Sequence, residues 1–199
     1  ANVKTTERVA KSISAACCRR LIFLSFHGAT TKSKNPYLTS KAQTENILIS
    51  TGLPTTILRS SHIIGPPMHP GPTAKALIAG PSGMVPVLGG GSQRWAPVAL
   101  KDVIAAIIAA PALEHTGQLE LQGPEVMGLN ELSTILNPQK RLHRIHIPCP
   151  LAPLLRFTGM PEALIEVMLS DCFSDSKDIA TQISTVLGIE PTSLRHQWA

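Results

Sequence analysis

A tyrosine and a lysine four positions apart are the residues of this sequence best suited to chemistry. Tyr37 and Lys41 stand in the run Tyr-Leu-Thr-Ser-Lys, and on a helix side chains with this spacing share a face. A phenol with a pKa near ~10 needs help to transfer protons at neutral pH. The ammonium of Lys41 is expected to lower that pKa and so to prepare Tyr37 for acid–base catalysis. The alternative is an amphipathic tyrosine beside a surface lysine, because the pattern also occurs by chance.

The neighbouring segments predict the elements that would position this pair. A helical pattern over Val3 to Cys18 precedes the short apolar run Leu21 to Leu24, which is typical of a strand buried on both faces. Asn35 and Pro36 predict the start of a helix over residues 37–51, and the β-branched run 55–59 predicts a second strand. This alternation predicts an α/β fold with a parallel sheet covered by helices.

A serine follows the first of these strands. Ligands of open α/β sheets bind beyond the carboxyl ends of the strands. Ser25, the start of the Tyr37 helix and the segment after Leu58 should therefore converge on one crevice. Ser25 could donate a hydrogen bond to a substrate oxygen there, or it could simply end its strand.

The remainder of the chain divides by composition. Residues 65–97 are rich in proline and glycine and predict loops with one short helix near 73–79. Helices are expected near 101–110, 129–136, 151–157, 161–169 and 177–187, and strands near 118–121 and 144–147. We predict a Rossmann-like domain over residues 1–124, followed by a small and mainly helical substrate-side lobe over residues 125–199.

Composition excludes several classes of function. The net charge is +5, but the basic residues are scattered, so we expect no nucleic-acid partner. The four cysteines show no Cys-x-x-Cys spacing and the histidines lack placed partners, so no metal site is predicted. Unpaired cysteines and the lack of a signal pattern favour a cytoplasmic protein. No apolar run reaches the ~18–20 residues that span a bilayer, so an integral membrane protein is not expected.

Several ordered motifs together resemble one family. Residues 21–25, then Asn-Pro-Tyr-Leu-Thr-Ser-Lys-Ala-Gln-Thr-Glu at 35–45, are similar to the extended and atypical short-chain dehydrogenase/reductases. These are relatives of the nucleoside-diphosphate-sugar epimerases and the NmrA-like proteins. Residues 52–66, 97–103 and 123–125 also resemble segments of this family in the same order. The resemblance therefore extends over most of the chain.

The resemblance implies a role for each candidate residue. Tyr37 would be the acid/base, while Lys41 would bind the nicotinamide ribose of NAD or NADP and tune Tyr37. Ser61, His62 and Ile63 would lie beside the nicotinamide. The implied function is that of an NAD(P)-linked oxidoreductase or epimerase acting on an unidentified small molecule. Asp102 would be structural and would cap its helix.

Departures from the family pattern favour a second interpretation. The second residue of the Ser-Phe pair, Phe26, stands where the family commonly has its catalytic hydroxyl, and Arg59 is followed by serine instead of proline. The glycine-rich turn that receives the cofactor's pyrophosphate in the family does not occur in this sequence. We therefore expect NAD(P) binding only if an N-terminal segment is supplied. A non-catalytic protein that binds or senses the dinucleotide, or helps an assembly, is the alternative.

The same departure predicts a property of the sheet. Without the family's N-terminal strands, the strand at Leu21 to Leu24 becomes an edge with unpaired backbone groups. Such an edge should either pair with another chain or make the polypeptide unstable and prone to aggregate. The third alternative, which we favour, is that the sequence is a fragment or a truncated gene product.

Overall fold

A computed structural model describes residues 2–13, 18–114, 116–158, 161–174 and 178–199, and it centres on a parallel sheet. Strand β2 (Thr55–Ser60) lies between β1 (Leu21–Phe26) and β7 (Gly117–Leu121), and both neighbours run parallel to it. Five of the six residues of β2 are buried, as expected for a central strand with both faces covered. The two predicted N-terminal strands are confirmed, and each is slightly longer than expected.

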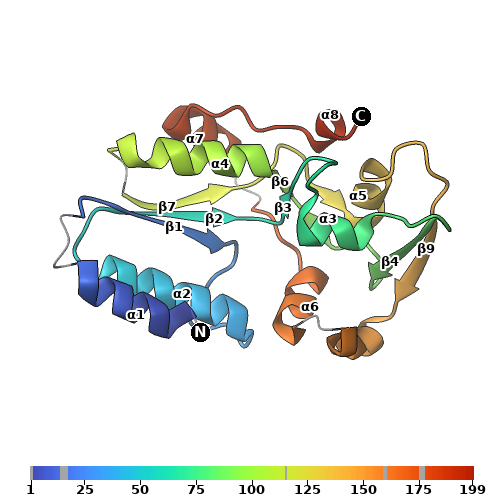
Figure 1. Cartoon of the computed structure of the whole chain (residues 1–199), viewed down its shortest axis with the longest axis horizontal. Helices are drawn as coiled ribbons and strands as arrows, with labels where there is room; N and C mark the ends of the chain where they lie inside the picture. The colour runs from blue at the N-terminus through green and yellow to red at the C-terminus, as the bar shows by residue number, and fades with distance from the viewer. Residues whose placement is uncertain (1, 14–17, 115, 159–160, 175–177) are drawn as a thin grey trace.

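Helices cover both faces of this sheet (Figure 1). Helices α1 (Asn2–Ile13) and α2 (Pro36–Ile49) lie on one face, and α4 (Leu100–Ala109) and α7 (Asp178–Leu187) lie on the other. The predicted α/β class is thereby confirmed. The predicted first helix was expected to reach Cys18, but Cys18 lies in a coil before β1, and residues 14–17 lie outside the described part.

The start of α2 follows from local sequence. The side-chain Oδ1 of Asn35 accepts hydrogen bonds from the backbone N–H groups of Tyr37 at 2.9 Å and Leu38 at 3.3 Å, as predicted for a cap. Pro36 occupies the first turn, where its missing N–H costs nothing. After the helix, Gly52 has a φ of +74°, a left-handed conformation that glycine adopts without strain. Tyr37 is thus fixed in the first turn.

A smaller lobe lies beyond the carboxyl ends of β1 and β2 (Figure 1). Its sheet pairs β4 (Met84–Leu88) with β9 (His143–Ile147) in parallel. The other elements there are β3 (Ile63–Ile64) paired with β6 (Val98–Ala99), β5 (Arg94–Trp95) paired with β8 (Met127–Gly128), the helices α3 (Gly71–Leu77), α5 (Leu129–Ile135), α6 (Glu162–Leu169) and α8 (Leu194–Gln197), and the 3-10 helix η2 (Cys149–Thr158). A further 3-10 helix, η1 (Ala110–Ala112), directly follows α4 at the central sheet. The sequence predicted loops where β4 lies, because Pro86 weakens the strand pattern.

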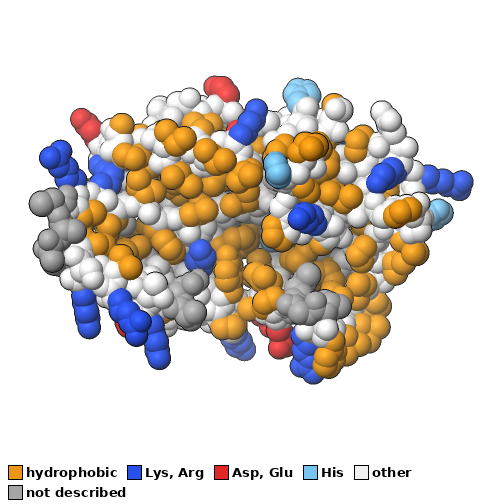
Figure 2. Space-filling model, in the orientation of Figure 1, with side chains coloured by type: hydrophobic (Ala, Val, Ile, Leu, Met, Phe, Trp, Pro, Cys, Tyr) orange, Lys and Arg blue, Asp and Glu red, His pale blue; other side chains and the backbone are white. Residues whose placement is uncertain are grey.

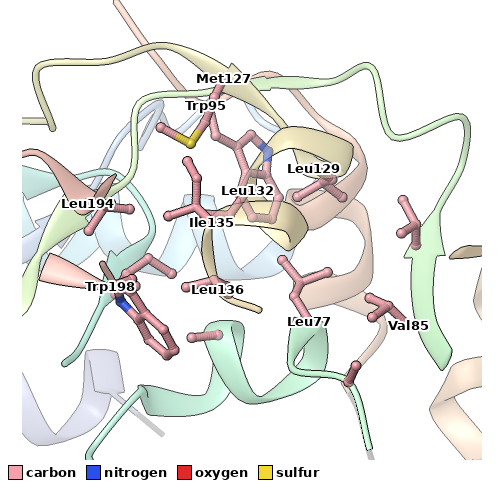
Figure 3. Close-up of a cluster of buried hydrophobic side chains, with 14 of the residues drawn as sticks. Leu77, Val85, Trp95, Met127, Leu129, Leu132, Ile135, Leu136, Leu194 and Trp198 are labelled. Atoms are coloured by element: carbon pink, nitrogen blue, oxygen red, sulfur yellow. The ribbon is translucent and has the colours of Figure 1, made fainter. Parts of the chain in front are cut away.

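One core holds this lobe together. Trp95, Leu77 and Leu132 pack within it, and Figure 3 shows the C-terminal Trp198 among the same side chains. The core takes residues from both sides of position 124, so the proposed division of the chain there does not separate two cores.

Asp102 has a different role from the one expected. It does not cap its own helix, because the N-cap of α4 is Ala99 and makes no side-chain bond. Instead, its two carboxylate oxygens accept hydrogen bonds at 2.7 Å from the backbone N–H and the hydroxyl of Thr192. Asp102 therefore ties the C-terminal segment to α4.

None of the helices in the described residues has the length and apolar character required to cross a membrane.

Candidate functional site

A cavity of about 340 Å³ opens where β1 and β2 end. Its walls come from the ends of these strands, from α2, and from α3 and α6 of the smaller lobe. The six residues that the sequence proposed for the site all line it: Ser25, Tyr37, Lys41, Ser61, His62 and Ile63. The walls are mainly apolar, as is usual for small-molecule sites, with few polar groups to orient a ligand.

The Tyr37 and Lys41 side chains share this cavity but do not form the expected activated pair. The Nζ of Lys41 lies 5.8 Å from the centre of the Tyr37 ring and donates a hydrogen bond to the carbonyl of Leu24 at 3.0 Å. Burial raises the pKa of Tyr37, with a smaller contribution from the charge of Cys172. Burial also lowers the pKa of Lys41, and Glu45 partly opposes that change. The expected lowering of the Tyr37 pKa is therefore not found.

The raised pKa of Tyr37 restricts the chemistry that its hydroxyl can perform. A phenol whose pKa is raised above its ordinary value stays protonated throughout the neutral range. Tyr37 can donate a hydrogen bond to a ligand in the cavity, but it is a poor base in this state. A bound cation or a movement of Lys41 toward the hydroxyl would be needed to change that.

The serines of the cavity donate their protons to the protein. Ser25 donates to Glu45 at 2.5 Å, Ser60 donates to the carbonyl of Ser25 at 3.3 Å, and Ser61 donates to the carbonyl of Ala96. The hydroxyl proton of Ser25 is therefore directed at a buried carboxylate instead of the cavity. Each of these hydroxyls retains a lone pair that could accept a bond.

Glu45 lies next to the cavity, where its carboxylate accepts the hydroxyl proton of Ser25, and no role was predicted for it from the sequence. Its side chain is only 3% exposed and receives two bonds from Arg59, at 3.1 and 2.6 Å. The second guanidinium nitrogen also donates to the carbonyl of Ala29 at 3.0 Å. The spacing of Lys41 and Glu45 on one helix was the available signal, since residues four apart share a face. The Glu45–Arg59 pair joins α2 to β2 directly beneath Ser25.

Aromatic rings form another part of the cavity wall. Phe26 contacts Tyr37 and His62 edge to face, with ring centres 5.6 and 5.4 Å apart. His62 in turn stacks on Trp95 at 3.6 Å. Trp95 is fully buried and its indole N–H donates to the carbonyl of Ser170, so it packs in the core.

The buried His62 is neutral. Burial lowers its pKa to about 3, and its Nε2 has no hydrogen-bond partner among the described residues. Within those residues, no group of three histidine, cysteine or carboxylate side chains is placed to hold a metal ion. His62 therefore contributes a planar ring to the wall and no charge.

No known family profile matches the chain, but several solved structures share its architecture. UDP-glucuronic acid 4-epimerase from Bacillus cereus, in complex with UDP-glucuronic acid and NAD, superimposes with a TM-score of 0.71 over 99% of this chain and 64% of that one, at 19% identity. The NADPH-dependent quinone oxidoreductase QOR2 from Escherichia coli, in complex with NADPH, gives 0.72 over 98% of this chain and 69% of that one, at 21% identity.

A curated relative matches at the level of sequence. It is NADH dehydrogenase [ubiquinone] 1 alpha subcomplex subunit 9, mitochondrial, from Arabidopsis thaliana, which is 31% identical over 143 residues. The match covers 67% of this chain and 34% of the relative, so the chain matches about a third of the relative's length. The chain thus has the fold of the epimerase and of the quinone oxidoreductase named above.

Proposed function

We propose that this chain forms the nicotinamide side of an NAD(P) site in a protein that binds the dinucleotide without turning it over. The observation that carries the proposal is Phe26, whose ring occupies the place expected for a catalytic hydroxyl and packs against Tyr37. The protons of Ser25, Ser60 and Ser61 are directed to protein acceptors, so they do not replace it. A substrate carbonyl would find only Tyr37 as a donor among these hydroxyls.

The lining of the cavity fits one end of a dinucleotide. The Lys41 ammonium sits on a flexible stem and could exchange the Leu24 carbonyl for ribose hydroxyls. Ser61, His62 and Ile63 would lie along the nicotinamide, and Tyr37 would donate to the ribose or to a carbonyl. When bound, the nicotinamide would supply the capacity for hydride transfer. The solved relatives described as NAD or NADPH complexes support this assignment.

Dinucleotide binding can be tested by titration with NADH and NADPH of this chain extended by an N-terminal segment that carries the glycine-rich turn. Trp95 stacks behind His62, so energy transfer from its indole to a bound reduced nicotinamide should quench its fluorescence. We expect Lys41→Met to weaken binding at least about tenfold through the loss of one charged hydrogen bond, and Tyr37→Phe to weaken it less, by about threefold, through the loss of a neutral one. Neither the parent chain nor Tyr37→Phe should oxidise NAD(P)H.

The exposed Lys101 on α4 provides a matched control, and Lys101→Met should leave the titration unchanged. Trp198→Phe removes the second tryptophan signal without altering the cavity lining. If the Lys41→Met and Lys101→Met variants bind NADH and NADPH with the same affinity, as judged by the quenching of tryptophan fluorescence, the proposed site is contradicted.

An oxidoreductase or epimerase-like enzyme is the second candidate. It is favoured by the opening of Tyr37 and Lys41 onto one cavity. Steady NAD(P)H oxidation in the presence of quinones, or epimerisation of UDP-sugars, that is abolished by Tyr37→Phe would establish this candidate. That result would also overturn the non-catalytic proposal.

The compartment and the assembly state belong to the same proposal. The described cysteines are free thiols, which suits the cytoplasm expected from the sequence. The relative's name places that protein in mitochondria as a subunit of a larger complex. We propose a role as an assembly subunit, and fractionation of cells that carry the tagged chain would decide between the two compartments.

The outer edge of β1 supports association with another chain. The N–H groups of Leu21 and His27 bond toward β2, so the alternate residues 22, 24 and 26 direct their backbone groups away from β2. The carbonyl of Leu24 already accepts from Lys41 and that of Phe26 from the N–H of Ala29, so pairing would centre on Ile22. We propose that this edge pairs with a strand of a second copy. Sedimentation should show a concentration-dependent dimer, and a monomer at all concentrations would contradict the pairing.

A further inference from the structure

The 3-10 helix η2 exposes an apolar ridge to solvent. A 3-10 helix has three residues per turn, so positions three apart align along its length. Leu151, Leu154 and Phe157 form one such row, and their exposed fractions are 50%, 55% and 75%. Ala152, by contrast, is fully buried against the core beneath η2. The helix therefore has an inner face that packs and an outer row of large apolar side chains that touches water.

The apolar surface continues onto the sheet of the smaller lobe. Leu88 and Ile147 lie opposite each other in β4 and β9 and pack under η2. Side chains two positions apart share a face of a strand, so Met84 and Ile145 extend the same face away from η2. Both are exposed, at 50% and 52%. In Figure 2 the part of the molecule where Figure 1 places β9 and η2 is largely covered by apolar side chains.

Cations flank this surface, while the exposed Glu162 and Glu166 lie on α6, which packs against η2. The sequence contains no Asp or Glu between Glu131 and Glu162, while Lys140, Arg141 and Arg156 fall within that interval. The guanidinium of Arg156 lies 5.0 Å from the ring centre of Phe157, so a cation sits directly beside the most exposed apolar side chain. Apolar side chains flanked by cations are the pattern of segments that bind the interface of an anionic bilayer.

We propose that η2 and the adjoining outer face of β4 and β9 dock on the surface of an anionic lipid bilayer. Leu154 and Phe157 would enter the boundary between headgroups and acyl chains, and Arg156 would reach back to the phosphates on its long apolar stem. The three apolar side chains project into solvent, and η2 contains prolines at positions 150 and 153. Fluid acyl chains accommodate projecting side chains without a matching groove, which a folded protein partner would have to supply. The proposed dinucleotide cavity is not required for this docking.

Flotation of the full chain with lipid vesicles tests the proposal. Vesicles of phosphatidylcholine with phosphatidylglycerol should bind the chain, and vesicles of phosphatidylcholine alone should bind it at least about tenfold less, since the cations provide part of the attraction. The double change Leu154→Ser with Phe157→Ser should reduce binding to the anionic vesicles at least about tenfold. Arg156→Glu should also reduce it, and added salt should abolish the difference between Arg156→Glu and the parent.

A matched control comes from another exposed apolar residue. Ile108 on α4 is 73% exposed and lies on the opposite side of the central sheet from α2, so Ile108→Ser should leave vesicle binding unchanged. Thermal melts of all variants should coincide, because every changed side chain is exposed. Equal flotation of the parent and the double variant would overturn the proposal. So would a lack of vesicle binding, or loss of a protein partner or of self-association as the sole effect of the double change.

Discussion

Replacing Glu45 by glutamine is expected to destabilise the chain by about 3 kcal/mol, because breaking a buried ion pair leaves one charge uncompensated. The Glu45 side chain is 3% exposed and Arg59 17%, so water can hydrate the remaining guanidinium only in part. The substitution also changes the acceptor of the Ser25 hydroxyl. Urea unfolding should show a lower midpoint with an unchanged slope.

A surface pair provides the control for this experiment. Glu131 and Arg195 also form an ion pair, but their side chains are 47% and 53% exposed. Glu131→Gln should therefore cost under about 1 kcal/mol. Changing Glu45 and Arg59 together, to glutamine and methionine, should recover much of the loss because no unpaired charge remains. If the loss of stability in the double variant equals the sum of the losses in Glu45→Gln and Arg59→Met, the pair does not contribute as described.

Acid is expected to unfold the chain partly through His62. Its pKa is about 3 in the folded state, against an ordinary value near ~6.5 in the unfolded chain. Between these pH values His62 is protonated in the unfolded state but not in the folded state. The free energy of unfolding therefore falls as the pH falls from about 6.5 toward 3. By pH 4 the loss attributable to His62 should be about 3 kcal/mol, measured by urea unfolding at a series of pH values.

Carboxylates also titrate in acid, so the difference between two variants is the informative quantity. His62→Phe keeps a planar ring against Trp95 and removes the titration, and its stability should fall less steeply below pH 6.5 than that of the parent. The exposed His69 is the control, since His69→Phe should follow the parent curve. If the free energy of unfolding depends on pH in the same way for the parent and for His62→Phe, His62 is accessible to protons in the folded state and the prediction is wrong.

The candidate site could be located from sequence because its positions are set by local rules. The cap at Asn35 fixes where α2 starts, helical spacing puts Tyr37 and Lys41 on one face, and the strand before Ser25 ends at the same edge of the sheet. Each of these features depends on neighbours a few residues away. The α/β class followed in the same way from the alternation of strand and helix patterns.

Strand β4 could not be read from local patterns, whereas its partner β9 was predicted near residues 144–147. The strand β4 contains Pro86 and pairs with β9, which lies more than fifty residues later in the chain. Such short strands are stabilised by their distant partners and by the core around Trp95, so their own sequences carry little signal. The prediction that Asp102 caps its helix failed for the same reason, since its partner Thr192 comes from the far C-terminus.

The sequence by itself therefore placed six residues that line the cavity, since helix starts and strand ends follow from neighbouring residues, while the lining from α3 and α6 was decided by tertiary packing. The protonation behaviour and the hydrogen-bond partners of those residues were decided by the tertiary structure. Lys41 turns to the Leu24 carbonyl, Ser25 turns to Glu45, and burial holds the pKa of Tyr37 above its ordinary value. The physical reason is that desolvation and hydrogen-bond competition depend on every group that packs around a side chain, and most of those groups are distant in sequence.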